Sequence, residues 1–270
     1  MKRSSTPLSQ LARVVAWTSL FLGSGAAAAE GRTDALPAIA IIVDDLGYSR
    51  HDGLRALALP GPIAYSVLPH TPAARMLAEK AHERGKDVLL HLPMEPMDGN
   101  RGLGEGAIMN RMTREEVLRT VIDNLASVPH AIGVNNHMGS LLTAQPQPMQ
   151  WVMEALREQG RLIYVDSRTT TRTVARLAAE EQRLPFLSRD VFLDNERGTD
   201  YVWRQFDELV RRAHRDGHAL AIGHPRQDTL SVLEEALPRL GSQGVRLVRL
   251  HDLLTLKQRS HASWQLSSSH

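Results

Sequence analysis

Two adjacent carboxylates, Asp44 and Asp45, directly follow the apolar run 39–43 and stand just before Gly47. A short apolar run bounded by a turn residue is typical of a buried parallel strand, and folds built from such strands carry their active sites at the carboxyl ends of the strands. Neighbouring side chains on a strand point to opposite faces, so the two carboxylates can take different roles around one centre, one binding a metal ion and one accepting a proton. The alternative is that one Asp caps a following helix and the other is solvated.

Three histidines, His91, His137 and His224, also follow short apolar runs. A single histidine in this position is usually structural, but three of them together with an Asp pair favour a metal site. A carboxylate and two imidazoles form a ligand set suited to Zn²⁺, with a fourth position open for water. A Zn²⁺ ion lowers the pKa of its water to about 7 and polarises a carbonyl group, as the hydrolysis of an amide or ester requires. A second carboxylate can then act as general base, and a histidine across the site can protonate the leaving group.

Apolar runs alternate with helical patterns from residue 38 onward, and this alternation predicts how these residues are positioned. The predicted helices include 113–126, where Thr113 and Glu116 form a capping-box pattern, and 200–215, which ends before Gly217. Regular alternation implies a parallel sheet, and seven or eight repeats imply a closed or nearly closed barrel, with an open doubly wound sheet as the alternative. The predicted strands are 39–43, 63–68, 87–91, 131–134, 162–166, 184–187, 219–222 and 245–248, and the other predicted helices are 71–84, 148–159 and 229–240.

The length and composition are those of one large α/β domain. A chain of 270 residues suits one barrel of roughly 250 residues, and 42% hydrophobic residues suffice for a sizeable core. The formal net charge of +2 is too small to indicate a nucleic-acid partner. The absence of cysteine excludes disulfides and thiolate chemistry.

The start of the chain has the pattern of a secretory signal peptide: a basic beginning at Lys2 and Arg3, the apolar stretch 14–23 and the small residues 25–29. The apolar stretch is shorter than the about 20 residues of a spanning helix, so we expect cleavage near Ala29 and only transient contact with the membrane; an uncleaved anchor is the alternative. We expect the mature protein in the periplasm. The predicted organisation is a signal peptide over 1–29, a linker over 30–37, a catalytic domain over 38–257 and a flexible tail over 258–270.

The polar motifs resemble those of the divergent polysaccharide deacetylases, a branch of the carbohydrate esterase and polysaccharide deacetylase superfamily. The resemblance covers roughly residues 38–254. It implies a deformed (β/α) barrel of about seven strands and metal-dependent N-deacetylation of an acetylated glycan, with Asp44 as general base and Asp45 as metal ligand. The segments that carry it are 43–47 (VDDLG), 91–96 (HLPMEP), 133–140 (GVNNHMGS), 166–168 (DSR) and 223–225 (GHP).

The sequence departs from the family pattern at three places: the motif of the metal ligands, the arginine that holds the base, and the aromatic residue that often closes the sugar site, which is missing from 166–170. The usual H-x-x-x-H motif after the third strand is represented here by His91 and Glu95, so either Glu95 or His137 supplies the third ligand. We favour His137, because it ends a strand and small residues follow it. The arginine that holds the base in the family has no counterpart at its usual place, and Arg168 is the candidate replacement. The glycine-rich segment 102–107 is predicted to be a flexible loop over the site.

The sequence therefore predicts an exported hydrolase that uses a divalent metal, Zn²⁺ by its ligand set, and acts on an acetylated glycan. Asp45, His91 and His137 would bind the metal, Asp44 would be the base and His224 the acid, while Asp166 would orient or pair within the site. The rival hypothesis is a deacetylase-like domain that binds cell-wall glycan or a cell-wall enzyme without turnover.

Overall fold

In the computed structural model, residues 36–160 and 162–267 are described. The predicted signal peptide, and all of the predicted linker except its last two residues, lie outside the described residues. Within the described ranges, nine strands form one sheet whose paired neighbours all run parallel. The strands are β1 (Ala38–Leu46), β2 (Ala64–Val67), β3 (Asp87–Met94), β4 (Ala131–Met138), β5 (Ile163–Asp166), β6 (Phe186–Ser188), β7 (Val191–Phe192), β8 (His218–Gly223) and β9 (Arg246–Leu247).

The sheet is curled, with the strand order β6-β5-β4-β3-β2-β1-β8-β7, and β9 pairs with β1 beside this path. Strands β6 and β7 stand at the two ends of the order, yet only Arg189 and Asp190 separate them in the chain. The backbone N–H of Arg189 donates to Asp166 of β5, and that of Asp190 donates to Leu220 of β8. The deformed barrel is thus confirmed, with eight strands along its path where about seven were expected.

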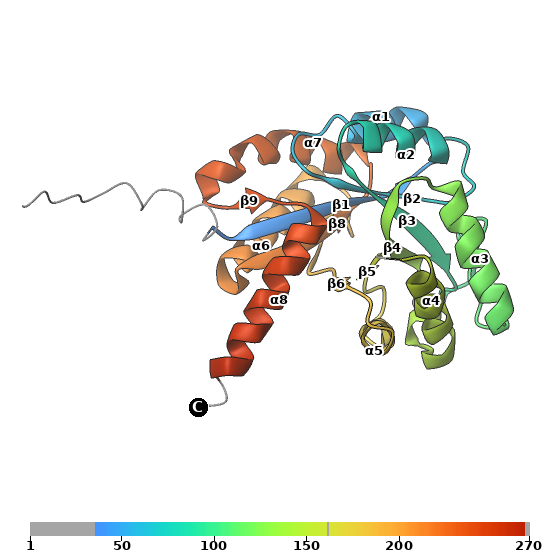
Figure 1. Ribbon diagram of the computed structural model, residues 1–270. Helices are drawn as coiled ribbons and strands as arrows, with labels where there is room; N and C mark the ends of the chain where they lie inside the picture. The colour runs from blue at the N-terminus through green and yellow to red at the C-terminus, as the bar shows by residue number, and fades with distance from the viewer. Residues whose placement is uncertain (1–35, 161, 268–270) are drawn as a thin grey trace, which may run out of the picture. The chain divides into compact units, whose positions relative to one another are not determined.

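Helices follow most strands, and Figure 1 shows α1 beside α2 and α3 beside α4. Helix α3 begins with the predicted capping box between Thr113 and Glu116, and α6 ends at Gly217 in the left-handed conformation. The short helices α1 and α5, of seven residues each, were not predicted, because so few residues show no clear helical period. The helices are α1 (Arg50–Ala56), α2 (Ala74–Glu83), α3 (Arg114–Ser127), α4 (Pro146–Glu158), α5 (Ala175–Glu181), α6 (Thr199–Asp216), α7 (Gln227–Ala236) and α8 (Leu250–Ser267), with 3₁₀ turns at Leu142–Ala144 and Leu237–Gln243.

The predicted domain boundary at residue 257 falls inside a helix. Helix α8 extends from Leu250 to Ser267 and therefore covers most of the predicted tail, because neither Pro nor Gly interrupts this stretch of sequence. None of the described helices is both long enough and apolar enough to span a membrane.

Alternation along the strands divides the apolar residues into two cores. On β1, Ile39, Ile41 and Val43 belong to the large core between sheet and helices. The alternate residues Ala38, Ala40 and Ile42 face the inside of the curled sheet, where they form a smaller core with Leu250, Leu253 and Leu254 of α8. The start of α8 therefore contributes apolar side chains to the inside of the curled sheet.

Candidate active site

The inner face of the sheet changes from apolar to polar at the carboxyl ends of the strands. Every second residue of a strand points to the same face, and Ile42, Leu89, Val165 and Ile222 all belong to the inner core. The polar residues found two positions further on, on the same face, are Asp44, His91, Ser167 and His224. Asn135 of β4 pairs in register with His91 of β3 and joins the same group.

Asp45 reaches the same centre as Asp44 only because β1 is irregular at its end. By alternation the side chain of Asp45 would face the helices, as that of Val43 does. However, the pairing of β1 with β2 shifts register between Val43 and Leu46, and Asp45 has a φ of 57°. A bulge of this kind re-aims a side chain, and it turns the Asp45 carboxylate towards His91 and His137. Both neighbouring carboxylates therefore face one site.

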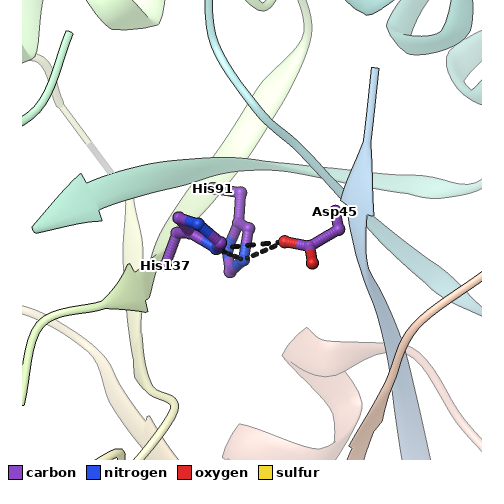
Figure 2. Close-up of side chains that lie close together, drawn as sticks. All are labelled: Asp45, His91 and His137. Atoms are coloured by element: carbon purple, nitrogen blue, oxygen red, sulfur yellow. Dashed lines mark hydrogen bonds and ion pairs between the residues drawn. The ribbon is translucent and has the colours of Figure 1, made fainter. Parts of the chain in front are cut away.

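Asp45, His91 and His137 bring three potential ligand atoms into a small triangle (Figure 2). Asp45 Oδ1 lies 3.1 Å from His91 Nε2 and 3.0 Å from His137 Nδ1, and the two ring nitrogens are 3.2 Å apart. Around a tetrahedral Zn²⁺ with bonds of about 2.0–2.1 Å, ligand atoms are about 3.3 Å apart. Asp45 Oδ1 is buried and has no hydrogen-bond partner in the described structure. A buried carboxylate oxygen left without a hydrogen bond beside two ring nitrogens fits a divalent metal ion.

The far nitrogen of each imidazole faces an oxygen acceptor, which fixes the tautomer that a metal ligand needs. His91 Nδ1 lies 2.9 Å from Asn135 Oδ1, and His137 Nε2 lies 3.1 Å from the carbonyl oxygen of Gly102. When these nitrogens carry the proton and donate it, His91 Nε2 and His137 Nδ1 keep free lone pairs inside the triangle. Gly102 belongs to the loop between β3 and α3, so the segment predicted to lie over the site does contact it.

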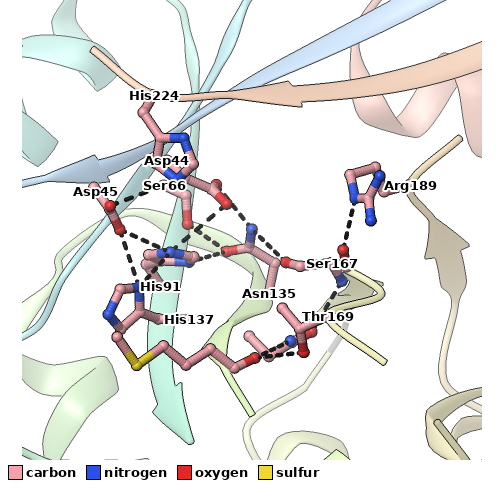
Figure 3. Close-up of polar contacts among 12 residues, drawn as sticks. Asp44, Asp45, Ser66, His91, Asn135, His137, Ser167, Thr169, Arg189 and His224 are labelled. Atoms are coloured by element: carbon pink, nitrogen blue, oxygen red, sulfur yellow. Dashed lines mark hydrogen bonds and ion pairs between the residues drawn. The ribbon is translucent and has the colours of Figure 1, made fainter. Parts of the chain in front are cut away.

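Asn135 connects the general-base candidate to the triangle (Figure 3). Its side chain is fully buried, and its Nδ2 donates to Asp44 Oδ1 at 2.8 Å and to Ser167 Oγ at 3.3 Å. Its Oδ1 accepts from Ser66 Oγ as well as from His91. One amide thereby orients both Asp44 and His91.

Burial and the neighbouring charges set the protonation of the inner residues. Burial raises the pKa of Asp44, and the nearby His91 and His224 offset this only in part. Burial also acts to raise the pKa of Asp45, but the imidazoles of His137 and His91 outweigh it and hold that pKa well below its usual range. Burial acts to lower the pKa of His91, whereas the two carboxylates raise it to about 9. The Asp45 carboxyl is therefore deprotonated, and Asp44 is the more basic of the two carboxylates.

His224 lies across the site with its own buried carboxylate partner, Asp194. His224 Nε2 is 3.5 Å from Asp45 Oδ2, and its Nδ1 is 2.9 Å from Asp194 Oδ1. Asp194 is held in turn by Thr229 Oγ1 and by the backbone N–H of His224. Burial acts to lower the pKa of His224, but Asp194 and Asp45 outweigh it and raise that pKa, which favours the protonated form of an acid catalyst.

The remaining predicted residues lie outside this cluster. Glu95 accepts from the backbone N–H of Asn110 and is not part of the triangle. Asp166 follows Tyr164 on the outer face and accepts from the backbone N–H of Arg168 and from Thr173 Oγ1, so it holds the turn after β5. The side chain of Arg168 is exposed and forms no ion pair within the described residues, whereas Asn135 occupies the place beside Asp44.

Sequence reasoning missed three polar residues, Asn135, Asp194 and Arg189. Asn135 could have been found from its position, because it is two residues before His137 and therefore on the same face of the strand. Asp194 follows a strand of only two residues that gave no pattern in the sequence. The Nε of Arg189 donates to the carbonyl of Ser167 at 2.7 Å, a contact that follows from the pairing of β5 with β6, in which Asp166 lies opposite Ser188.

Comparisons with known proteins agree with this fold. The sequence profile described as divergent polysaccharide deacetylase matches residues 41–254. The uncharacterised protein YibQ of Escherichia coli is 38% identical over 220 residues, which are 82% of this chain and 68% of YibQ. An uncharacterised protein of Haemophilus influenzae is 37% identical over 215 residues, or 80% of this chain and 76% of that protein. The crystal structure of an uncharacterised protein of Agrobacterium tumefaciens superposes with a TM-score of 0.77 at 21% identity and covers 81% of this chain and 89% of its own.

Proposed function

Because the chain belongs to the divergent polysaccharide deacetylase family, we propose that it is an exported, metal-dependent hydrolase that removes N-acetyl groups from a glycan. The observation that carries this proposal is the triangle of Asp45, His91 and His137, with its unsatisfied carboxylate oxygen. Zn²⁺ is the ion that a set of one carboxylate and two imidazoles favours.

The metal would be held by Asp45, His91 and His137. When bound, it would polarise the acetyl carbonyl and make a water molecule more acidic. The protein's own residues supply the proton transfers. Asp44 takes a proton from the attacking water as the new C–O bond forms, and its raised pKa makes it a better base than an ordinary aspartate.

His224 completes the reaction on the other side of the site. It gives its proton to the amide nitrogen as the C–N bond breaks, so the products are acetate and the free amino sugar. Asp194 keeps the His224 ring in place through the hydrogen bond from Nδ1 and stabilises its protonated form. The donor nitrogen Nε2 faces the carboxylates of the site.

Metal analysis tests the ligand assignment. The purified protein should bind about one divalent ion per chain, and His91→Ala or His137→Ala should abolish this binding. Glu95→Gln is the matched control, because Glu95 is the alternative third ligand suggested by the sequence but is not part of the triangle, and it should keep the metal. Retention of full metal by His137→Ala together with its loss from Glu95→Gln would refute the assignment.

Hydrolysis tests the catalytic proposal. Asp44→Asn is nearly isosteric and should keep the metal but lose the release of acetate from acetylated chito-oligosaccharides and peptidoglycan. One observation favours the alternative of a binding domain without turnover: among the described residues, Asp44 is held by an amide and forms no ion pair with an arginine. If the metal-loaded wild type releases no acetate yet binds glycan as tightly as Asp44→Asn does, the binding domain replaces the enzyme.

A further inference from the structure

We propose that a basic cleft beside the metal site binds a carboxylate on the glycan, so that the substrate is an acidic N-acetylated glycan. This inference rests on the proposed function, because it names the substrate class of the same site. The cleft has a volume of about 520 Å³ and lies between the turn after β5, the β6–β7 connection and α6. Its walls include Arg168, Thr169, Arg189, Phe192 and Tyr201.

Two residues that line the cleft, Ser167 and Phe192, also contact residues of the catalytic cluster. Ser167 lines the cleft and accepts from Asn135, which holds Asp44. Phe192 also lines the cleft, and its ring meets the His224 ring edge-on with centroids 5.4 Å apart. A sugar whose amide nitrogen lies at His224 would therefore have its substituents, or the next sugar, over the cleft.

Two arginines of the cleft are near carboxylates, Asp166 for both and also Asp44 and Asp190 for Arg189, but neither guanidinium is in direct contact with one in the described structure. Within the described ranges, neither Arg168 nor Arg189 forms an ion pair with an acidic side chain. Of the acidic residues of the cleft, Glu208 pairs with Arg212, and Asp190 accepts from the backbone N–H of Leu220 and makes no salt bridge to Arg168 or Arg189 within the described residues. The cleft thus keeps guanidinium groups available for an anion.

Arg189 is held in place before any ligand arrives. Its Nε and one terminal nitrogen donate to the carbonyl oxygens of Ser167 and Arg168 at 2.7 and 2.9 Å, and its guanidinium lies 4.8 Å from the centre of the Phe192 ring (Figure 3 shows the Ser167 bond). A pre-ordered guanidinium loses little freedom on binding, and its planar fork matches a carboxylate. Because Asp190 and Glu208 also line the cleft, a singly charged carboxylate suits it better than a dianion.

A sugar carboxylate has two common chemical sources, a lactyl ether on an amino sugar and a uronic acid. Equilibrium binding distinguishes them when metal-loaded Asp44→Asn protein is titrated with three oligosaccharides of equal length. One is a neutral N-acetylglucosamine chain, one carries a lactyl-ether carboxylate on alternate sugars, and one carries alternate uronic acids. At least one acidic chain should bind tighter than the neutral chain, by roughly tenfold at low salt, with the advantage shrinking as salt rises.

Charge-neutral variants in the same background test the role of the cleft. Adding Arg168→Gln should reduce the preference for the acidic chain about 10-fold. The matched control is Arg176→Gln, because Arg176 is also an exposed arginine, lies on α5 and pairs with Glu180 outside the cleft, and this variant should leave the preference intact.

Equal affinity for neutral and acidic chains, or an equal effect of the Arg168 and Arg176 variants, overturns the inference. Either result leaves acetate release by the wild type, and therefore the proposed function, untouched. Conversely, Arg168-dependent binding of the acidic chain by a protein that releases no acetate would support the cleft and refute the hydrolase.

Discussion

Replacing Asn135 by alanine should weaken metal binding although Asn135 is not a metal ligand. The side chain makes four buried hydrogen bonds, to Asp44, Ser66, His91 and Ser167. Loss of the partner on His91 Nδ1 frees the ring and its tautomer, and the loss of such a supporting contact typically costs 10- to 100-fold in metal affinity, or about 1.4–2.7 kcal/mol. Competition with a chromophoric chelator measures this affinity directly.

The adjacent Asn136 provides a matched control. It is equally buried, but it faces away from the cluster, where it donates to the carbonyl of Met138 and accepts from the backbone N–H of Ser167. Each substitution leaves at least three buried polar groups without a partner, at roughly 1–3 kcal/mol apiece, so both should lower the free energy of unfolding of the metal-free protein by at least about 3 kcal/mol. Urea unfolding measures this loss. Only Asn135→Ala should weaken metal binding, and an equal loss of affinity in both variants would refute the reasoning.

Three further outcomes are expected. Asp194→Asn should keep the metal but lower kcat for acetate release by about 10²-fold or more, because His224 loses the carboxylate that orients and protonates it; an unchanged kcat would exclude this role. Gly133→Ala should lower the free energy of unfolding by about 1–3 kcal/mol or more, because the new Cβ would lie 2.5 Å from a backbone oxygen of β5. In the same urea titration Gly241→Ala should have little effect, because a Cβ at Gly241 would have no atom within 4 Å. N-terminal sequencing of the exported protein should give a start near Glu30 in the soluble periplasmic fraction, and recovery of only the uncleaved chain from membranes would indicate an anchor.

The repeating strands and the parallel sheet were predictable because they depend on local patterns. A buried parallel strand is a short apolar run, and each of the eight predicted strands overlaps an observed one. Most of the missed elements are short, namely α1, α5 and the two-residue β7, and tertiary contacts rather than local preference stabilise pieces of this size. The exception is α8, a helix of 18 residues that extends into the predicted tail.

By itself, the sequence determined which residue types stand at the strand ends, and alternation then placed His91, His137 and His224 on the inner face. It could not determine that Asp45 joins them, because alternation sends Asp45 outward and only the bulge at the end of β1 reverses this. Nor could it show that Asn135 rather than Arg168 contacts Asp44, since that contact joins strands 91 residues apart. Spacing along the chain fixes the face of a strand to which a side chain points. Which faces meet, and which side chain fills the space between them, depends on the register and curvature of the assembled sheet.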